Sequence, residues 1–116
     1  WYLDDVEFSS LNGINIDDAI AESNNHLNLL KIKYPSKHII ITEAGWPTKT
    51  DENKIPNEWA TIDNQKKYYT EMNLWAKKNQ TLVFIFEAFD ELWKGSNNQN
   101  DPEKNWGLYY DNRKRK

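Results

Sequence analysis

Cysteine is absent from the 116 residues, which excludes a disulfide scaffold, a cysteine-ligated zinc site and thiol catalysis. The two histidines, His26 and His38, lie far apart and have no cysteine companions, so we expect no zinc site. No apolar run approaches the roughly 18 residues that a membrane span needs, and the first residues do not resemble a signal peptide. Because the chain begins at Trp1 rather than Met, we expect it to start inside a longer gene product.

An excess of one charge is also lacking. The chain has 15 Lys and Arg against 18 Asp and Glu, a formal net charge of −3, and the two signs are mixed along it. A nucleic-acid partner normally requires a basic stripe. The basic cluster at 113–116 is better explained by a frayed, solvated tail over 111–116. We therefore expect no nucleic-acid partner.

Aromatic residues are plentiful, whereas aliphatic residues are few. The chain has six Trp, six Tyr and four Phe, yet its mean hydropathy is −0.95. Its length allows one domain at most. Aromatic rings provide flat apolar surfaces, which a protein either buries or presents to a ligand.

The residue pattern predicts the order helix, strand, helix, strand. The first helix is expected to begin after an N-cap at Asn15 and to stop at 34–36, and the second to run from the N-cap Thr61 to Asn79. The runs 38–42 and 81–86 are apolar without alternation, which is typical of parallel strands buried on both faces. In parallel βα units, functional groups gather on the loops past the carboxyl ends of the strands. The expected apolar positions are Ile16, Ala19, Ile20, Leu27, Leu30 and Tyr34 in the first helix, and Tyr68, Tyr69, Met72, Trp75 and Ala76 in the second.

Both predicted strands lead into acidic residues. Glu43 follows the first strand, and Glu87, Asp90 and Glu91 follow the second. A carboxylate beside a buried strand is costly unless it is paired, so two such strands indicate a common site. Glu43 has the fixed position required of a nucleophile or general base, and Trp46 offers a flat face to a sugar ring. The alternative is a structural salt bridge at Glu43 and a Trp46 packed in the core.

The acidic segment 84–94 also has two interpretations. In one, its acids and Lys94 line a pocket in which the lysine keeps the carboxylates ionised. In the other, Asp90 and Lys94 form an i,i+4 pair on one helical turn, which contributes only about 0.2–0.5 kcal/mol.

Three segments together resemble the closing motifs of glycoside hydrolase family 17, in its bacterial and fungal branch of β-1,3-glucanases and glucanosyltransferases. They are Ile-Thr-Glu-Ala-Gly-Trp-Pro at 41–47, Phe-Glu-Ala-Phe-Asp-Glu-Leu-Trp-Lys at 86–94 and Glu-Lys-Asn-Trp-Gly-Leu-Tyr at 103–109. The approach to the first strand, with Tyr34, Pro35 and Lys37, also fits, so the resemblance covers essentially the whole chain. It implies an α/β fold in which residues 1–116 are the C-terminal segment of a catalytic TIM barrel, with strands seven and eight and their helices.

The resemblance also implies roles for single residues. Glu43 matches the nucleophile of a retaining mechanism, and Glu91 and Lys94 match an acid and a lysine that shape the catalytic pocket. Trp46 is expected to lie nearest to the sugar. The positions expected to bind substrate are Trp46, Glu87, Asp90, Glu91, Trp93 and Lys94, and Trp106 falls on a further aromatic position of the family.

This interpretation leaves out half of the catalytic pair. Retaining glycosidases need two carboxyl groups about 5–5.5 Å apart, and in this family the acid/base follows the fourth strand, upstream of the residues here. A TIM barrel typically takes about 250 residues. We therefore expect the chain alone to be inactive, and the parent protein to be a β-glucan hydrolase or transglycosylase of the endo- or exo-β-1,3-glucanase type. The resemblance implies no metal or organic cofactor, a β-glucan partner, and a secreted, periplasmic or cell-wall location.

Two other classes of protein fit the residues as well. One is a non-catalytic carbohydrate-binding module in which Trp46, Trp93 and Trp106 stack on sugars, and the other is an inert α/β fragment. A binding module would keep its affinity for glucan when Glu43 is replaced by Gln, whereas an enzyme would lose turnover.

Overall fold

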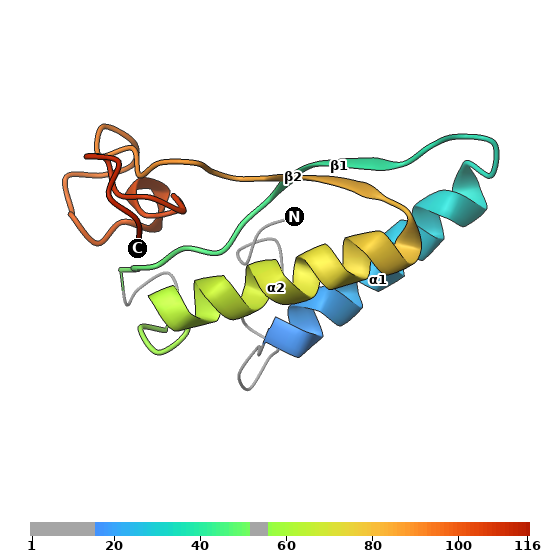
Figure 1. Ribbon diagram of the computed structural model, residues 1–116, viewed down its shortest axis with the longest axis horizontal. Coiled ribbons are helices and arrows are strands. Elements are labelled where there is room, and N and C mark those ends of the chain that lie inside the picture. Colours follow the sequence, from blue (N-terminus) through green and yellow to red (C-terminus); the bar gives the residue numbers. More distant parts are fainter. Residues whose placement is uncertain (1–15, 52–55) are drawn as a thin grey trace.

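Two helices cover one side of a pair of parallel strands (Figure 1). The computed structural model describes residues 16–51 and 56–116. The elements follow in the order α1 (Ile16–Lys33), β1 (Ile40–Ala44), α2 (Ile62–Asn79), β2 (Leu82–Ile85) and a short 3-10 helix, η3 (Pro102–Lys104). The predicted alternation of helix and strand is confirmed, while the predicted N-cap Asn15 lies outside the described residues.

The register of the two strands contains an irregularity. Ile41 pairs with Val83, but Ala44 pairs with Ile85, so β1 carries one more residue than β2 over this stretch. Such a bulge redirects the side chains of the strand. Thr42 and the residue after it are both exposed between the buried Ile41 and Ala44, where a regular strand would alternate.

Helix α2 begins and ends where the sequence predicts. The hydroxyl of Thr61 accepts a hydrogen bond from the backbone N–H of Asn64 at 3.1 Å, which satisfies one of the free donors of the first turn. Asp63 lies in the first turn, where the helix dipole favours an acid. After Asn79, Gln80 adopts a left-handed conformation (φ 50°) and its N–H donates to carbonyls of the last turn.

The core lies between the helices and the strands. It is built largely from the large residues of α2, and α1 contributes less. Tyr34, predicted on the apolar face of the first helix, is 44% exposed because α1 ends at Lys33. The buried core residues are Ile16 and Leu27 of α1, Ile41 and Ala44 of β1, Trp46, and Tyr68, Met72, Trp75 and Ala76 of α2.

The strands are buried on one face only, so the prediction of burial on both faces is wrong for the part of the chain that the structure describes. Leu82 is 55% and Phe84 54% exposed. The reason is that α1 and α2 both lie on the same side of the sheet (Figure 1). Neither described helix is long and apolar enough to cross a membrane.

The segment after β2 folds into loops that end in an ordered tail. Tyr109 bridges Phe89 in parallel and Arg115 in antiparallel fashion. The side chain of Lys116 is only 2% exposed. Residues 111–115 are exposed, whereas the side chain of Lys116 is drawn into the fold by Thr48 and Asp90, so the expected tail does not include this last lysine.

Candidate active site

Two of the predicted acids lie at the carboxyl ends of the two paired parallel strands. Glu43 lies inside β1, one residue before Ala44, rather than after the strand. The carbonyl of Ala44 accepts a hydrogen bond from the N–H of Phe86 at 2.9 Å, and Glu87 follows Phe86 directly. The bulge leaves the side chain of Glu43 on the exposed side of the strand. The sheet therefore brings Glu43 and Glu87 to the same edge.

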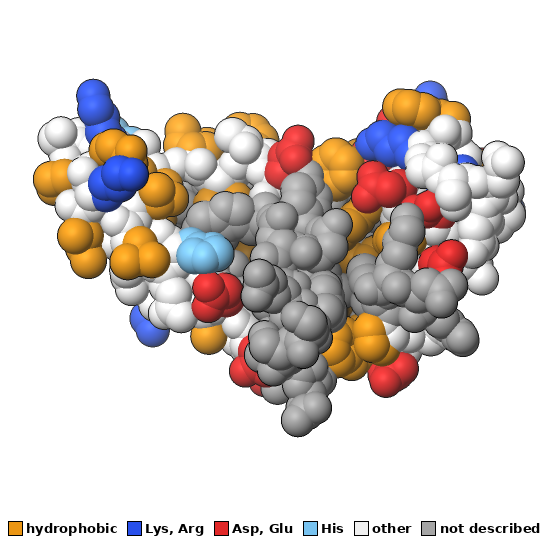
Figure 2. Space-filling model, turned by 180° about the vertical axis from the view of Figure 1, so that it is seen from behind, with side chains coloured by type: hydrophobic (Ala, Val, Ile, Leu, Met, Phe, Trp, Pro, Cys, Tyr) orange, Lys and Arg blue, Asp and Glu red, His pale blue; other side chains and the backbone are white. Residues whose placement is uncertain are grey.

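Lys94 is the cation of this site. Its Nζ lies 3.0 Å from Oε2 of Glu87 and also contacts Oε2 of Glu91. The ammonium lies 4.6 Å from the ring centre of Phe86 and 5.6 Å from that of Trp93, within the range of cation–π attraction. Figure 2 shows acidic and basic side chains close together at the end of the molecule that holds the C-terminal segment. The site is therefore a cluster of paired charges beside aromatic rings.

One cation faces two carboxyl groups, and their pKa values move apart. Burial raises the pKa of Glu87 from 4.5 to about 7, and the hydrogen bond from Lys94 only partly offsets this. The hydrogen bond from Lys94 lowers the pKa of Glu91. Burial alone would lower the pKa of Lys94, but hydrogen bonds to Glu91 and Glu87 outweigh it and raise the pKa. Lys94 thus favours the ionised form of both carboxyl groups, but at Glu87 burial opposes it more strongly, and the buried Oε1 of Glu87 has no hydrogen-bond partner among the described residues.

Asp90, which the sequence predicts in the substrate site, makes its hydrogen bonds with residues other than Glu87, Glu91 and Lys94. Its Oδ1 accepts hydrogen bonds from the N–H of Gly107 at 3.0 Å and from Nζ of Lys116 at 2.7 Å. Of the two interpretations of this segment, the i,i+4 pair of Asp90 with Lys94 is not the one formed, because Lys94 pairs with Glu87 and Glu91. Asp90 is 7% exposed, and its contacts are those of a structural carboxylate.

The tryptophans divide into buried and exposed ones. Trp46 is 1% exposed, and its Nε1 donates to the carbonyl of Trp59 at 2.8 Å. Trp106 is 2% exposed. The prediction that Trp46 stacks on a sugar is therefore wrong for this structure, as is the expectation of Trp106 as a platform, because both rings are used in packing. Trp93 is 77% exposed and presents its ring beside Lys94.

Several residues that hold the site were missed in the sequence. Tyr69 of α2 donates its hydroxyl hydrogen to the carbonyl of Phe86 at 3.0 Å, directly before Glu87. Gln65 of α2 donates to the carbonyls of Trp46, Trp106 and Gly107, at 2.9, 3.1 and 3.1 Å. Lys104 and Lys116 are both buried at their ammonium ends. No sequence signal distinguishes these polar residues from solvated ones, because their role depends on backbone carbonyls far along the chain.

Gly45, between Glu43 and the buried Trp46, is required by close packing. A Cβ at this position would lie 2.3 Å from the carbonyl oxygen of Phe86 and 3.0 Å from the ring of Trp106. The two strands can approach at the site only because Gly45 has no side chain.

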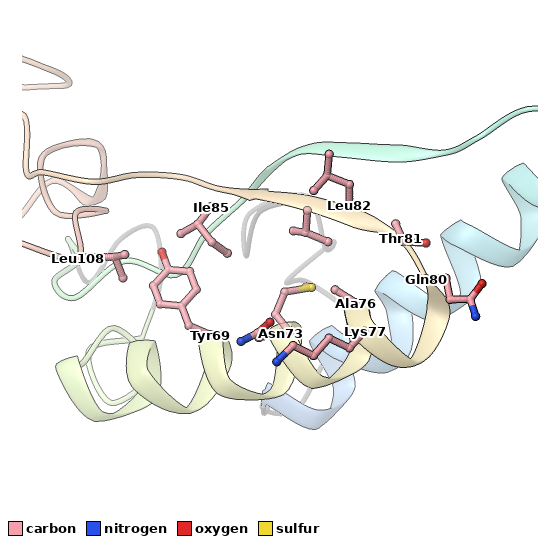
Figure 3. Close-up of a pocket in the computed structure, with 11 residues that line it drawn as sticks. Tyr69, Asn73, Ala76, Lys77, Gln80, Thr81, Leu82, Ile85 and Leu108 are labelled. Carbon is pink, nitrogen blue, oxygen red and sulfur yellow. The ribbon is translucent and has the colours of Figure 1, made fainter.

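A pocket of about 610 Å³ between α2 and β2 is separate from the charged cluster (Figure 3). Its lining includes Tyr69, Lys77, Leu82 and Leu108 but no acidic residue. It therefore offers no carboxyl pair for glycoside chemistry. Among the described residues, no group of three or more histidines and acids is placed to hold a metal ion.

Comparison with known proteins agrees with the motifs. The family model of the BtgE/BtgC glycoside hydrolase domain matches residues 8–107. A probable glucan endo-1,3-beta-glucosidase btgC of Aspergillus terreus is 36% identical over 112 residues, covering 83% of this chain and 17% of that protein. A glucan 1,3-beta-glucosidase of Saccharomyces cerevisiae is 35% identical over 74 residues, covering 60% of this chain and 22% of that protein. The chain thus spans about a fifth of the length of these relatives.

Solved structures share the fold. An active-site mutant of Rhizomucor miehei beta-1,3-glucanosyltransferase in complex with laminaritriose superposes with a TM-score of 0.76 at 24% identity, over 90% of this chain and 36% of that one. An endo-laminarinase from Formosa superposes with a TM-score of 0.66 over 82% of this chain and 25% of that one. The second structure of the Rhizomucor enzyme is described as glycoside hydrolase family 17. The predicted resemblance to a family of β-glucan-cleaving glycoside hydrolases is confirmed: the chain belongs to the BtgE/BtgC glycoside hydrolase domain family and shares its fold with a structure of glycoside hydrolase family 17.

Proposed function

We propose that this chain supplies the seventh and eighth strands of a TIM barrel in a retaining β-glucan hydrolase or transglycosylase, with Glu43 as the nucleophile. The observation that carries the proposal is the position of Glu43 at the carboxyl end of β1, which pairs in parallel with β2, the strand that leads into the cluster of Glu87, Glu91 and Lys94. In TIM-barrel enzymes the catalytic residues lie at this end. The glucanase names of the relatives support the same substrate class.

The reaction proceeds in two displacements. A carboxylate oxygen of Glu43 attacks the anomeric carbon, the glycosidic bond breaks, and the leaving oxygen takes a proton from an acid supplied by another part of the barrel. Water or a sugar hydroxyl then attacks the glycosyl-enzyme ester, gives its proton back to that same group and releases Glu43. No step needs a metal or an organic cofactor.

The neighbouring charged residues shape the pocket. Lys94 and Glu91 form an ion pair whose ammonium sets the local potential beside the nucleophile's strand. Trp93 offers an exposed ring on which a glucose ring stacks. We therefore assign the stacking on sugar, predicted for Trp46 from the sequence, to the exposed Trp93, because Trp46 is buried. A β-glucan substrate implies that the enzyme acts where glucan is found, outside the cell or in the cell wall.

The test is laminarin turnover by the gene product that contains this chain, expressed whole. Glu43→Gln should lower kcat on the order of 10³-fold or more, while the matched control Glu58→Gln, at an exposed loop position, should leave it unchanged. The 116-residue chain alone should show no turnover. Full activity in Glu43→Gln would contradict the assignment of the nucleophile, and turnover by the chain alone would contradict the need for a second carboxyl group elsewhere.

A glucan-binding module is the second candidate, and the exposure of Trp93 favours it. Such a module needs aromatic faces and no nucleophile. It would bind laminarin saturably without turnover, keep its affinity in Glu43→Gln and lose it in Trp93→Ala.

A further inference from the structure

Lys104 is a buried lysine whose ammonium meets backbone carbonyls. It ends η3, is 4% exposed, and its Nζ donates to the carbonyls of Leu92 and Lys94, both at 2.6 Å. These two carbonyls lie on either side of Trp93 in the chain. Fixing both of them fixes the backbone at Trp93 and Lys94, and with it the directions in which these two side chains leave the chain.

The backbone around Lys104 is itself held in place by hydrogen bonds. Asp101 caps η3 by accepting from the N–H of Glu103 at 3.1 Å, and it also accepts from the N–H of Ser96 at 2.9 Å. Asn105, next to Lys104, accepts a hydrogen bond at its carbonyl from the N–H of Thr48 at 2.9 Å. Thr48 lies in the loop that follows β1 and Glu43. Lys104 therefore connects the segment after β1 with the turn at 91–94.

Filling space does not require an ammonium at this position. A methionine would occupy a similar volume without the cost of taking a charge out of water. What the ammonium adds is charge-assisted hydrogen bonding, which sets the direction of the two carbonyls. The turn it holds also carries the hydrogen bond from the N–H of Lys94 to the carbonyl of Glu91 at 2.9 Å.

We propose that Lys104 is a positioning residue, whose ammonium fixes the turn at 91–94 so that Lys94 reaches Glu87 and Glu91 while Trp93 faces outward. The effect on turnover rests on the proposed glucanase function. Its effect on turnover acts through Lys94, and Lys104 does not itself contact the reacting sugar.

A double-mutant cycle in the whole gene product separates positioning from stability. Lys104→Met should lower kcat/KM for laminari-oligosaccharides about 10-fold at a temperature well below the melting transition. In a Lys94→Met background the same substitution should have less than a threefold effect, because its target is already gone. The control Lys78→Met, at an exposed position near the end of α2, should leave kcat/KM unchanged. A tenfold loss that persists in the Lys94→Met background, or a lowered Tm with unchanged kcat/KM, would overturn the proposal.

A second measurement does not depend on activity. Amide hydrogen exchange should be at least 10-fold faster over residues 91–95 in Lys104→Met, with exchange in α2 unchanged. Unchanged exchange over 91–95 would overturn the proposal even in a protein that does not cleave laminarin, whereas absence of turnover with the expected exchange would contradict the proposed function alone. If Lys104→Met does not fold, Lys104→Gln, which keeps one donor group, takes its place in both measurements with the same expectations and the same refuting results.

Discussion

The buried ion pair between Asp90 and Lys116 leads to a quantitative prediction of stability. Nζ of Lys116 lies 2.7 Å from Oδ1 of Asp90, and the two side chains are 2% and 5% exposed. At an effective dielectric constant of about 20, the attraction at this distance is about 6 kcal/mol. Desolvation of both groups cancels much of this attraction. Removing one partner nevertheless leaves a buried, uncompensated charge, which typically costs about 3–5 kcal/mol.

The two partners should not be equivalent. Lys116→Met leaves the Asp90 carboxylate buried with the N–H of Gly107 as its remaining hydrogen-bond donor. Asp90 cannot move to water, because it follows Phe89, which pairs with Tyr109. We therefore expect Lys116→Met to lower the free energy of unfolding by about 3–5 kcal/mol. Asp90→Asn keeps an oxygen for the N–H of Gly107, and the Lys116 ammonium keeps the Thr48 hydroxyl and the Asn105 carbonyl as acceptors, so its cost should be smaller, about 1–3 kcal/mol.

Urea unfolding of the purified protein, followed by circular dichroism, measures these differences. Lys67→Met is the matched control, because its ammonium lies 3.4 Å from Oδ1 of Asp17 while the two side chains are 49% and 71% exposed. Exposed pairs of this kind contribute about 0–1 kcal/mol. A loss below about 1 kcal/mol for Lys116→Met, equal to that of the control, would refute the reasoning that burial makes the Asp90 pair costly to break.

Three further predictions concern the site. Burial raises the pKa of Glu87 from 4.5 to about 7, so the folded state binds an extra proton between these pH values. The free energy of unfolding should therefore fall as pH rises from 4.5 to 7, by about 1–2 kcal/mol after the solvent screening of a partly exposed carboxyl group. Urea titrations should show a flatter slope in Glu87→Gln, and an unchanged slope would disprove the assignment to Glu87. Gly45→Ala should lower the free energy of unfolding by about 1–3 kcal/mol, because the new Cβ would lie 2.3 Å from the carbonyl oxygen of Phe86. We expect a lower Tm and a lower laminarin turnover. A variant with the wild-type Tm would contradict the close approach. Trp93→Ala should change the free energy of unfolding by less than about 0.5 kcal/mol, since Trp93 is 77% exposed. The same substitution should raise KM for laminari-oligosaccharides severalfold. An unchanged KM would exclude Trp93 as a sugar platform.

Local signals in the sequence were sufficient to predict the helices and strands. Thr61 is an N-cap followed by an acid in the first turn, and both effects depend only on neighbouring residues. The β-branched run before Glu43 predicts a strand for the same reason. The three motifs were sufficient for the family because residue types and order carry that information without any geometry.

Features that depend on distant backbone groups were not predictable. The bulge in β1 follows from the register with β2, so the sequence alone placed Glu43 after the strand rather than within it. Trp46 and Trp93 have the same side chain and similar polar surroundings in the sequence. They differ because the indole N–H of Trp46 meets the carbonyl of Trp59 in the core, and no periodicity of a loop predicts such a contact.

The low hydropathy of the chain has a structural counterpart in the segment after β2. Asp101, Lys104 and Asn105 are all less than 5% exposed there, and each of them hydrogen-bonds the backbone. Polar side chains thus hold the backbone of this segment in place, as apolar packing does around α2. Hydrogen bonds are directional, whereas apolar contacts are not. A segment held in this way fixes the orientation of Trp93 and Lys94 more sharply than an apolar core of the same size, which is what the proposed alignment of a sugar with Glu43 would require.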